Sequence, residues 1–160
     1  MEKGKLWKWG TDDDSWKHNI VHFGVPVAKY VDKLVKAWKK YGNIIICVDY
    51  DDTIVSHEDW NKEICIDVLN TIKEAKELGA KLILWTCRQY ENIETEVMDI
   101  EMDYGFYFDE VNPTEPFKER FSNKPYCNIM LDDKCGLDQA LYILKLAIEI
   151  YGEEKTKQLP

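Results

Sequence analysis

Acidic, hydroxyl and basic side chains follow three apolar segments of the chain, in an order that suits phosphate chemistry. The first segment runs into Asp49-Tyr50-Asp51-Asp52-Thr53, the second into Thr86-Cys87-Arg88 and the third into Asp132-Asp133, with Lys124 shortly before the third. Carboxylates crowded at one point repel one another, and a hard divalent cation with oxygen ligands relieves that repulsion. Such a set could hold Mg²⁺ against a phosphorylated ligand.

Each of these groups has an ordinary structural explanation when it is taken alone. An Asp directly after a strand commonly forms a turn, and a Thr in that place commonly caps the next helix. The groups occur together, however, and each one follows or adjoins an apolar run. A shared site is therefore favoured over a series of unrelated turns and caps.

Apolar runs and amphipathic segments alternate along the part of the chain that must position these groups. The runs suit buried strands, and they cover residues 44–48, 82–85, 106–111 and 128–131. Apolar residues at intervals of three and four predict helices over residues 60–78, 91–104 and 137–151. The alternation predicts an α/β fold, a three-layer Rossmann-like parallel sheet with helices on both faces. Ligands of such sheets bind at the carboxyl ends of the strands.

Two further parts of the chain lie outside this alternation. Residues 1–42 form a Trp-rich extension with one amphipathic helix, which begins after Pro26 and ends at Gly42. Its apolar stripe is expected to pack on the core domain, residues 43–152. The polar tail, residues 153–160, is expected to fray.

Composition and charge restrict the class of protein and of partner. The chain has 160 residues, of which 45% are hydrophobic and 32% charged, a globular composition and not a disordered one. The net charge of −9 opposes binding to a polyanion such as nucleic acid. Lysines line the polar face of the first helix: Lys29, Lys33, Lys36, Lys39 and Lys40. That face is interpreted as solvated, with a substrate-attracting patch as the alternative.

The cysteines and the apolar runs bear on the compartment. There are five cysteines and no CxxC pair, which favours buried thiols over a disulfide framework or a zinc site. No apolar run reaches the ~20 residues of a membrane span, and no apolar leader is visible at the N-terminus. We therefore expect a protein of the cytoplasm that has no membrane partner.

The motifs resemble those of the haloacid dehalogenase superfamily of phosphohydrolases. Residues 49–53 look like its first motif, DxDx[TV], and residues 82–86 look like its second, an apolar strand that ends in Thr. Lys124 followed by Asp132-Asp133 looks like its third and fourth motifs. A response-regulator receiver combines similar groups, but its acidic pair comes first in the chain. The resemblance covers residues 43–136.

This resemblance implies a role for each motif residue. Asp49 would be the nucleophile that forms an aspartyl-phosphate, and Asp51 the general acid and then the general base. Thr86 would hydrogen-bond a phosphoryl oxygen, and Lys124 would neutralise charge there. Mg²⁺ would be held by Asp49, Asp51 through its backbone carbonyl, Asp132 and Asp133.

Residues beside the motifs are expected to contact the substrate, namely Asp52, Cys87 and Arg88. Arg88 could fork onto a second phosphate or a carboxylate, or it could pair with the acidic helix 91–101. His57 is expected to be exposed to solvent, and Asn112 could line the mouth of the site.

The gaps between the motifs leave no room for the cap domain that many members of this superfamily carry. The resemblance therefore implies an open, capless Mg²⁺-dependent phosphohydrolase acting on a nucleotide or another small phosphorylated metabolite. Two alternatives stay open: a phosphatase that processes nucleic-acid ends, and a phosphate-binding or regulatory module without turnover. The N-terminal extension could also mediate a homo-oligomer.

Overall fold

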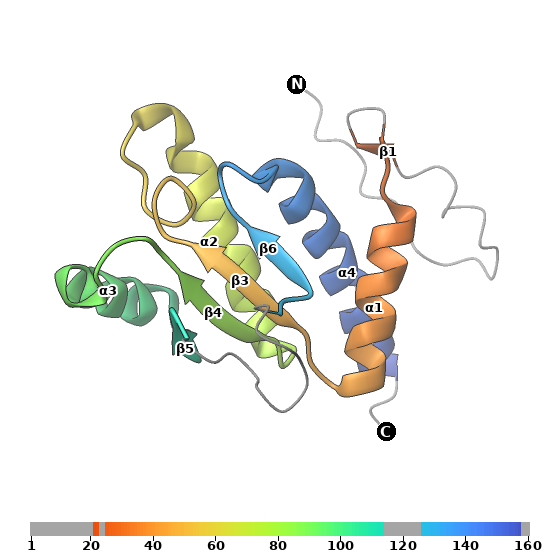
Figure 1. Cartoon of the computed structure of the whole chain (residues 1–160). Coiled ribbons are helices and arrows are strands. Elements are labelled where there is room, and N and C mark those ends of the chain that lie inside the picture. Colours follow the sequence, from red (N-terminus) through yellow and green to blue (C-terminus); the bar gives the residue numbers. More distant parts are fainter. Residues whose placement is uncertain (1–20, 23–24, 114–125, 158–160) are drawn as a thin grey trace.

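The computed structural model describes residues 21–22, 25–113 and 126–157, which Figure 1 shows in sequence colours. Lys124 and the first 20 residues therefore lie outside the described residues. The elements, in chain order, are β1 (Val21–His22), β2 (Val25–Pro26), α1 (Ala28–Tyr41), β3 (Ile45–Asp49), η2 (Asp59–Asn61), α2 (Lys62–Glu77), β4 (Lys81–Trp85), η3 (Tyr90–Asn92), α3 (Glu94–Tyr104), β5 (Glu110–Val111), β6 (Ile129–Leu131) and α4 (Leu137–Lys157).

Four parallel strands form the main sheet, in the spatial order β5-β4-β3-β6. The central strand β3 is apolar until it reaches Asp49, as expected for a strand with neighbours on both sides. Asp49 lies opposite Trp85 of β4, so residue 86 and the residues after β6 emerge at the same edge. The predicted α/β fold, a parallel sheet flanked by helices, is confirmed.

The two faces of β3 belong to different buried clusters. Ile46 and Val48 share the main core with the inward stripes of α2 and α4. Figure 1 shows these two helices side by side behind the sheet. On the other face, Ile45 and Cys47 form a smaller cluster, packed with Ile83, Trp85, Tyr126, Cys127 and Met130.

Helix α1 belongs to the main core and lies along α4 (Figure 1). Its buried stripe includes Val31, Leu34 and Trp38, and the Trp38 ring stacks on Tyr151 with centroids 4.7 Å apart. Strands β1 and β2 pair with each other in antiparallel fashion. Within the described residues they add no strand to the main sheet.

Two element boundaries differ from the sequence expectation. Helix α4 continues to Lys157, so the first five residues of the predicted polar tail are helical. Polar contacts hold this last part, because Lys39 pairs with Glu154 at 2.5 Å and Thr156 donates to the Gly152 carbonyl at 2.9 Å. None of the described helices is long and apolar enough to cross a membrane.

The third strand is also shorter than the predicted run 106–111, since β5 covers only Glu110–Val111. Phe106 and Phe108 supply the apolar signal, but they are buried as side chains in the core and not as strand residues. The backbone N–H of Phe108 donates to Glu101 of α3 at 2.7 Å, whereas the N–H of the next residue, Asp109, donates to the Leu82 carbonyl of β4 at 2.8 Å.

Candidate functional site

Three carboxylates meet at the carboxyl edge of the sheet. Asp49 ends β3, and Asp132 and Asp133 follow β6, the neighbouring strand. One carboxylate oxygen from each residue lies within 4.8 Å of the others. Thr53 fixes this meeting, because its Oγ1 accepts a hydrogen bond from the Asp133 backbone N–H at 3.1 Å. This hydrogen bond joins the two ends of the motif pattern, because Thr53 and Asp133 are 80 residues apart in the chain.

Electrostatics in this cluster disfavour full ionisation. The pKa of Asp49 is raised to about 6, mainly by burial and in part by the charges of Asp132 and Asp133, against a lowering hydrogen bond from the Tyr50 backbone. Lys134 stands 3.4 Å from an Asp133 oxygen, but it is exposed and can screen the group only weakly. Negative charge at this edge is therefore incompletely compensated by the described residues.

The loop after Asp49 turns back on itself through Asp52. Asp52 has φ of 55°, and its N–H donates to the Val55 carbonyl at 2.8 Å. Its carboxylate accepts from the Asn61 side chain at 2.8 Å and from the His57 backbone at 3.2 Å. Asp52 was expected to contact the substrate. One of its carboxylate oxygens instead holds η2 against the loop through these two hydrogen bonds.

Asp51 lies apart from the three-carboxylate cluster and is held by two basic side chains. Arg88 approaches it with Nε at 2.9 Å and Nη2 at 2.5 Å from Oδ1, and His57 Nε2 lies 2.7 Å from the same oxygen. The hydrogen bond from Arg88 holds the pKa of Asp51 below its usual range, and His57 acts in the same direction. Asp51 is therefore a carboxylate in this arrangement.

Arg88 makes its ion pair with Asp51, which neither sequence interpretation of Arg88 anticipated. Its guanidinium also lies 5.6 Å from the centre of the Tyr50 ring. The Tyr50 hydroxyl in turn donates a hydrogen bond to Glu96 of α3. The acidic helix α3 is therefore connected to Arg88 indirectly, through Tyr50. The guanidinium is about half exposed, which leaves it accessible to a ligand.

Thr86 is held at the same edge by Asn112. The Thr86 N–H donates to Asn112 Oδ1 at 2.8 Å, and Asn112 Nδ2 donates back to the Thr86 carbonyl at 2.7 Å. These two hydrogen bonds extend the contact between β4 and β5 to the residues that directly follow the two strands. The Thr86 hydroxyl accepts from the Arg88 N–H at 3.1 Å, whereas Cys87 between them is exposed.

The structure thus brings Asp49, Asp132 and Asp133 together, with Thr86 directly after the adjoining strand β4 and the Asp51–Arg88 pair on the loops after β3 and β4. The position of Lys124 is not among the described residues. Sequence reasoning missed the contacts of His57 with Asp51 and of Thr53 with Asp133. The Thr of the DxDxT pattern was a signal for the second contact, but no spacing rule pointed to the first.

Comparisons with known proteins add little to this geometry. The chain matches no protein-family model and no curated protein sequence. Among solved structures it is similar to a conserved protein from Bacteroides thetaiotaomicron, with 27% identity, a TM-score of 0.48, and coverage of 73% of this chain and 93% of that one. The functional interpretation therefore rests on the site itself.

Proposed function

We propose that the protein is a phosphohydrolase that cleaves a phosphomonoester through an aspartyl-phosphate on Asp49. The observation that supports this best is the meeting of Asp49 with Asp132 and Asp133 at the sheet edge. Thr86, directly after the neighbouring strand β4, would donate its hydroxyl hydrogen to a phosphoryl oxygen. Phosphoryl transfer needs mainly positioning and electrostatic stabilisation, so this small set of groups is sufficient.

The reaction would proceed in two displacements. An Asp49 oxygen attacks phosphorus, the bond to the ester oxygen breaks, and that oxygen leaves with a proton from Asp51. Asp51 then takes a proton from a water molecule that attacks the same phosphorus. The second displacement releases inorganic phosphate and restores Asp49.

The ion pair between Arg88 and Asp51 must open before the first of these steps can occur. Asp51 cannot donate a proton while Arg88 and His57 hold it as a carboxylate. A phosphomonoester dianion competes for the guanidinium, because Arg binds phosphate oxygens in the same forked geometry as carboxylate oxygens. Substrate binding would therefore draw Arg88 away from Asp51 and free the acid for protonation.

The donor set of the acidic cluster fits Mg²⁺. Three carboxylates supply hard oxygen ligands, and their mutual repulsion is what a cation would relieve. The residues that would hold the ion are Asp49, Asp132 and Asp133, with the Asp51 backbone carbonyl as a further ligand. A bound Mg²⁺ would neutralise charge on the phosphoryl oxygens.

A small substrate is favoured over nucleic acid. The chain carries a net charge of −9, and part of the lysine face of α1 is neutralised within the chain. Lys36 pairs with Asp32 at 2.7 Å, and Lys39 pairs with Glu154 at 2.5 Å. A nucleotide or another small phosphorylated metabolite therefore suits the protein better than a polyanion does.

A phosphate-binding module without turnover is the second candidate. The hold of Arg88 on Asp51 is the observation that favours it, since a permanently paired Asp51 could not act as an acid. Turnover measurements separate the two candidates directly.

The deciding experiment measures inorganic phosphate released from a panel of nucleotides, sugar phosphates and 3′-phosphorylated oligonucleotides, with and without MgCl2. We expect Mg²⁺-dependent release from small substrates, and Asp49→Asn should lower the rate by about a thousandfold or more. Asp99→Asn, an exposed acid on α3, is the matched control. Full activity of Asp49→Asn would remove Asp49 as the nucleophile, and full activity in excess chelator would remove the metal.

A further inference from the structure

Two cysteines lie together on the sheet face that carries the smaller buried cluster. Cys47 is the third residue of β3 and is 4% exposed, and Cys127 comes just before β6 and is half-buried. Both pack in the cluster that contains Ile45 and Ile83. Cys127 packs against the cluster that contains Cys47, and the two side chains influence each other, because their interaction raises the pKa of Cys47 and lowers that of Cys127. Both thiols are reduced in the structure.

This pair is unlike the other cysteines of the chain. Cys65 is buried on α2, and Cys87 and Cys135 are exposed on loops at the carboxyl edge. Cys47 and Cys127 instead lie in neighbouring segments and share one small cluster, and closeness of this kind is a precondition for a disulfide.

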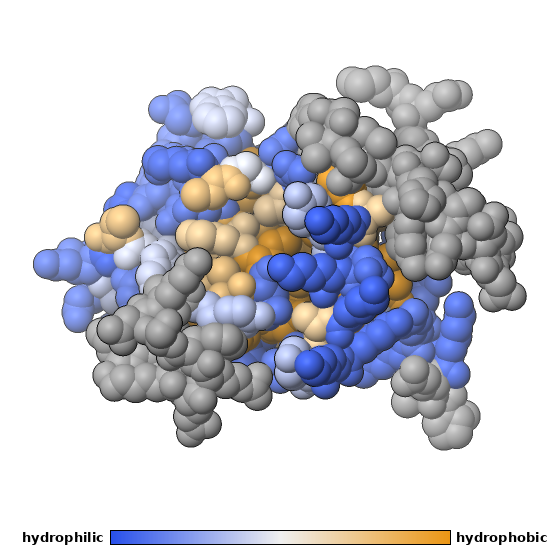
Figure 2. Space-filling model, turned by 45° about the vertical axis from the view of Figure 1, so that its right-hand side comes forward, coloured by the Kyte–Doolittle hydropathy of each residue, from blue (hydrophilic) through white to orange (hydrophobic). Residues whose placement is uncertain are grey.

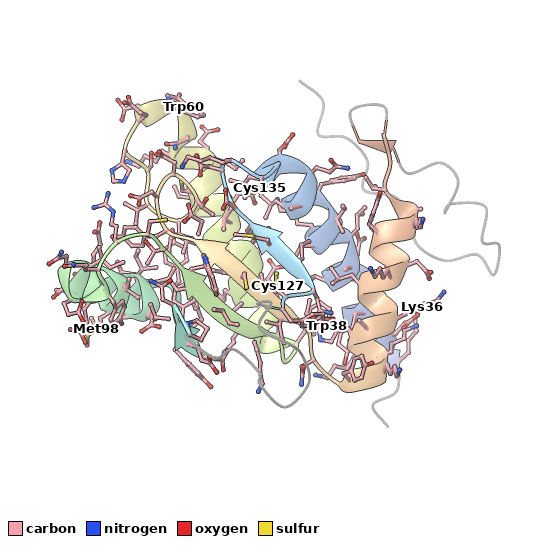
Figure 3. The ribbon with its side chains drawn as sticks, in the orientation of Figure 1. Lys36, Trp38, Trp60, Met98, Cys127 and Cys135 are labelled. Carbon is pink, nitrogen blue, oxygen red and sulfur yellow. The ribbon has the colours of Figure 1, made fainter. Side chains whose placement is uncertain are left out.

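A groove gives small molecules access to Cys127. It lies between α1, α4 and the start of β6, has a volume of about 360 Å³, and is lined by Lys33, Tyr126, Cys127 and Cys135 among others. Figure 3 shows Cys127 at the start of β6 and Cys135 at the opposite end of that strand. In Figure 2, with the α1 side turned forward, apolar surface lies between hydrophilic surface on this side of the molecule. Cys127 lines this groove, so a hydroperoxide that entered it would meet the Cys127 side chain, whereas Cys47 is not among the lining residues.

We propose that Cys47 and Cys127 form a peroxide-sensitive dithiol that closes to an intramolecular disulfide. The Cys127 sulfur attacks one peroxide oxygen, the O–O bond breaks, and a sulfenic acid forms while the other oxygen leaves as water or an alcohol. The Cys47 sulfur then attacks the Cys127 sulfur, and the sulfenic oxygen leaves as water. Two thiols and one hydroperoxide thus give one disulfide, one water and one water or alcohol.

The disulfide would connect the two strands that carry the acidic cluster. Cys47 precedes Asp49 by two residues on β3, and Cys127 precedes β6, after which Asp132 follows. The bond would close a long loop of the chain, and such loops constrain the unfolded state most strongly. Oxidation would therefore join β3 to the start of β6, and a thiol reductant would reverse it.

The test treats the intact, reduced protein with a limiting amount of hydrogen peroxide, alkylates the remaining thiols, and maps the digested peptides by mass spectrometry. We expect a linked peptide pair that contains Cys47 and Cys127, about 2 Da lighter than the two thiol peptides together. The two cysteines should lose alkylation in equal amounts, and dithiothreitol should restore both.

Three variants make the result decisive. Cys127→Ser should abolish the link and leave Cys47 alkylatable, and Cys135→Ser, in the same groove, should leave the link intact. Cys47→Ala should leave a Cys127 sulfenic acid that dimedone traps, which keeps the test valid should one of the variants fold poorly. A Cys127–Cys135 link, a link between two chains, or oxidation confined to the exposed Cys87 and Cys135 would overturn the proposal. The readout is covalent, so it is independent of the proposed phosphatase activity.

Discussion

Among the single residues of the site, Asp51 differs most from its expected role as a proton donor, because its ion pair with Arg88 keeps it ionised. The DxDxT pattern placed two carboxylates on one loop, but the structure gives them opposite environments. Burial and neighbouring charges raise the pKa of Asp49, whereas Arg88 and His57 lower that of Asp51. Carboxylates in different environments can take different roles in one reaction. Here the difference depends on where the Arg88 side chain lies.

Substitution of Arg88 tests whether the guanidinium moves to the substrate. Arg88→Lys keeps the charge but loses the fork, so we expect KM for a phosphomonoester to rise about tenfold while kcat changes less. Arg88→Ala should raise KM further. Steady-state kinetics of phosphate release measure both constants.

The matched control for that prediction is Lys134→Ala, which removes another exposed cation near the acidic cluster. It should change KM by less than about twofold. A rise in kcat of Arg88→Ala with unchanged KM would contradict transfer to the substrate, and it would mean that Arg88 acts only as a restraint on Asp51.

At the scale of elements, apolar patterning predicted most of the fold, because β3, β4 and the helices α1, α2 and α4 bury apolar runs or stripes. The pattern was weaker for β6 and α3, in which only Leu131 and Val97 are fully buried. The sheet edge of the candidate site followed from strand ends alone. The length of β5 could not be predicted in this way, since Phe106 and Phe108 are apolar for reasons of core packing. The last part of α4 includes a long-range ion pair between Glu154 and Lys39, which a local pattern does not contain.

The packing of α1 on α4 gives the prediction at this scale. Trp38 is fully buried and stacks on Tyr151, so Trp38→Ala should lower the free energy of unfolding by about 3–5 kcal/mol. Trp38→Phe should cost much less, because the indole Nε1 has no hydrogen-bond partner among the described residues. Urea unfolding, followed by circular dichroism, measures both values.

Tyr30→Ala is the control on the same helix, because Tyr30 is 51% exposed. Its effect should stay within about 0.5 kcal/mol. Equal stability of Trp38→Ala and the wild type would mean that α1 is an appendage and that the core holds together without it.

At the scale of the whole molecule, the acidic excess and the crowded sheet edge act in the same direction. The chain has 30 acidic and 21 basic residues, and three of the carboxylates share one small site. Folding brings these charges together, which costs free energy without a cation. The preformed set of carboxylate ligands therefore lowers the stability of the metal-free protein.

The environment of Asp49 makes the stability of the protein depend on pH. Its pKa rises from an ordinary value of 3.8 to about 6 on folding, mainly through burial, so the folded state binds this proton more tightly than the unfolded state does. The stabilising contribution is fully present below about pH 4 and is lost as pH rises through about 6. In chelator, the Tm of Asp49→Asn should thus match that of the wild type near pH 4 and exceed it by a few degrees above about pH 7. The gap is small because Asp49 is only partly buried and solvent screens its charge.

MgCl2 should raise the wild-type Tm above pH 7 and narrow the gap, since a ligand that binds only the folded state stabilises it. Asp99→Asn should show no pH-dependent difference from the wild type, and a gap for Asp49→Asn that is the same at every pH would contradict the assigned environment of Asp49.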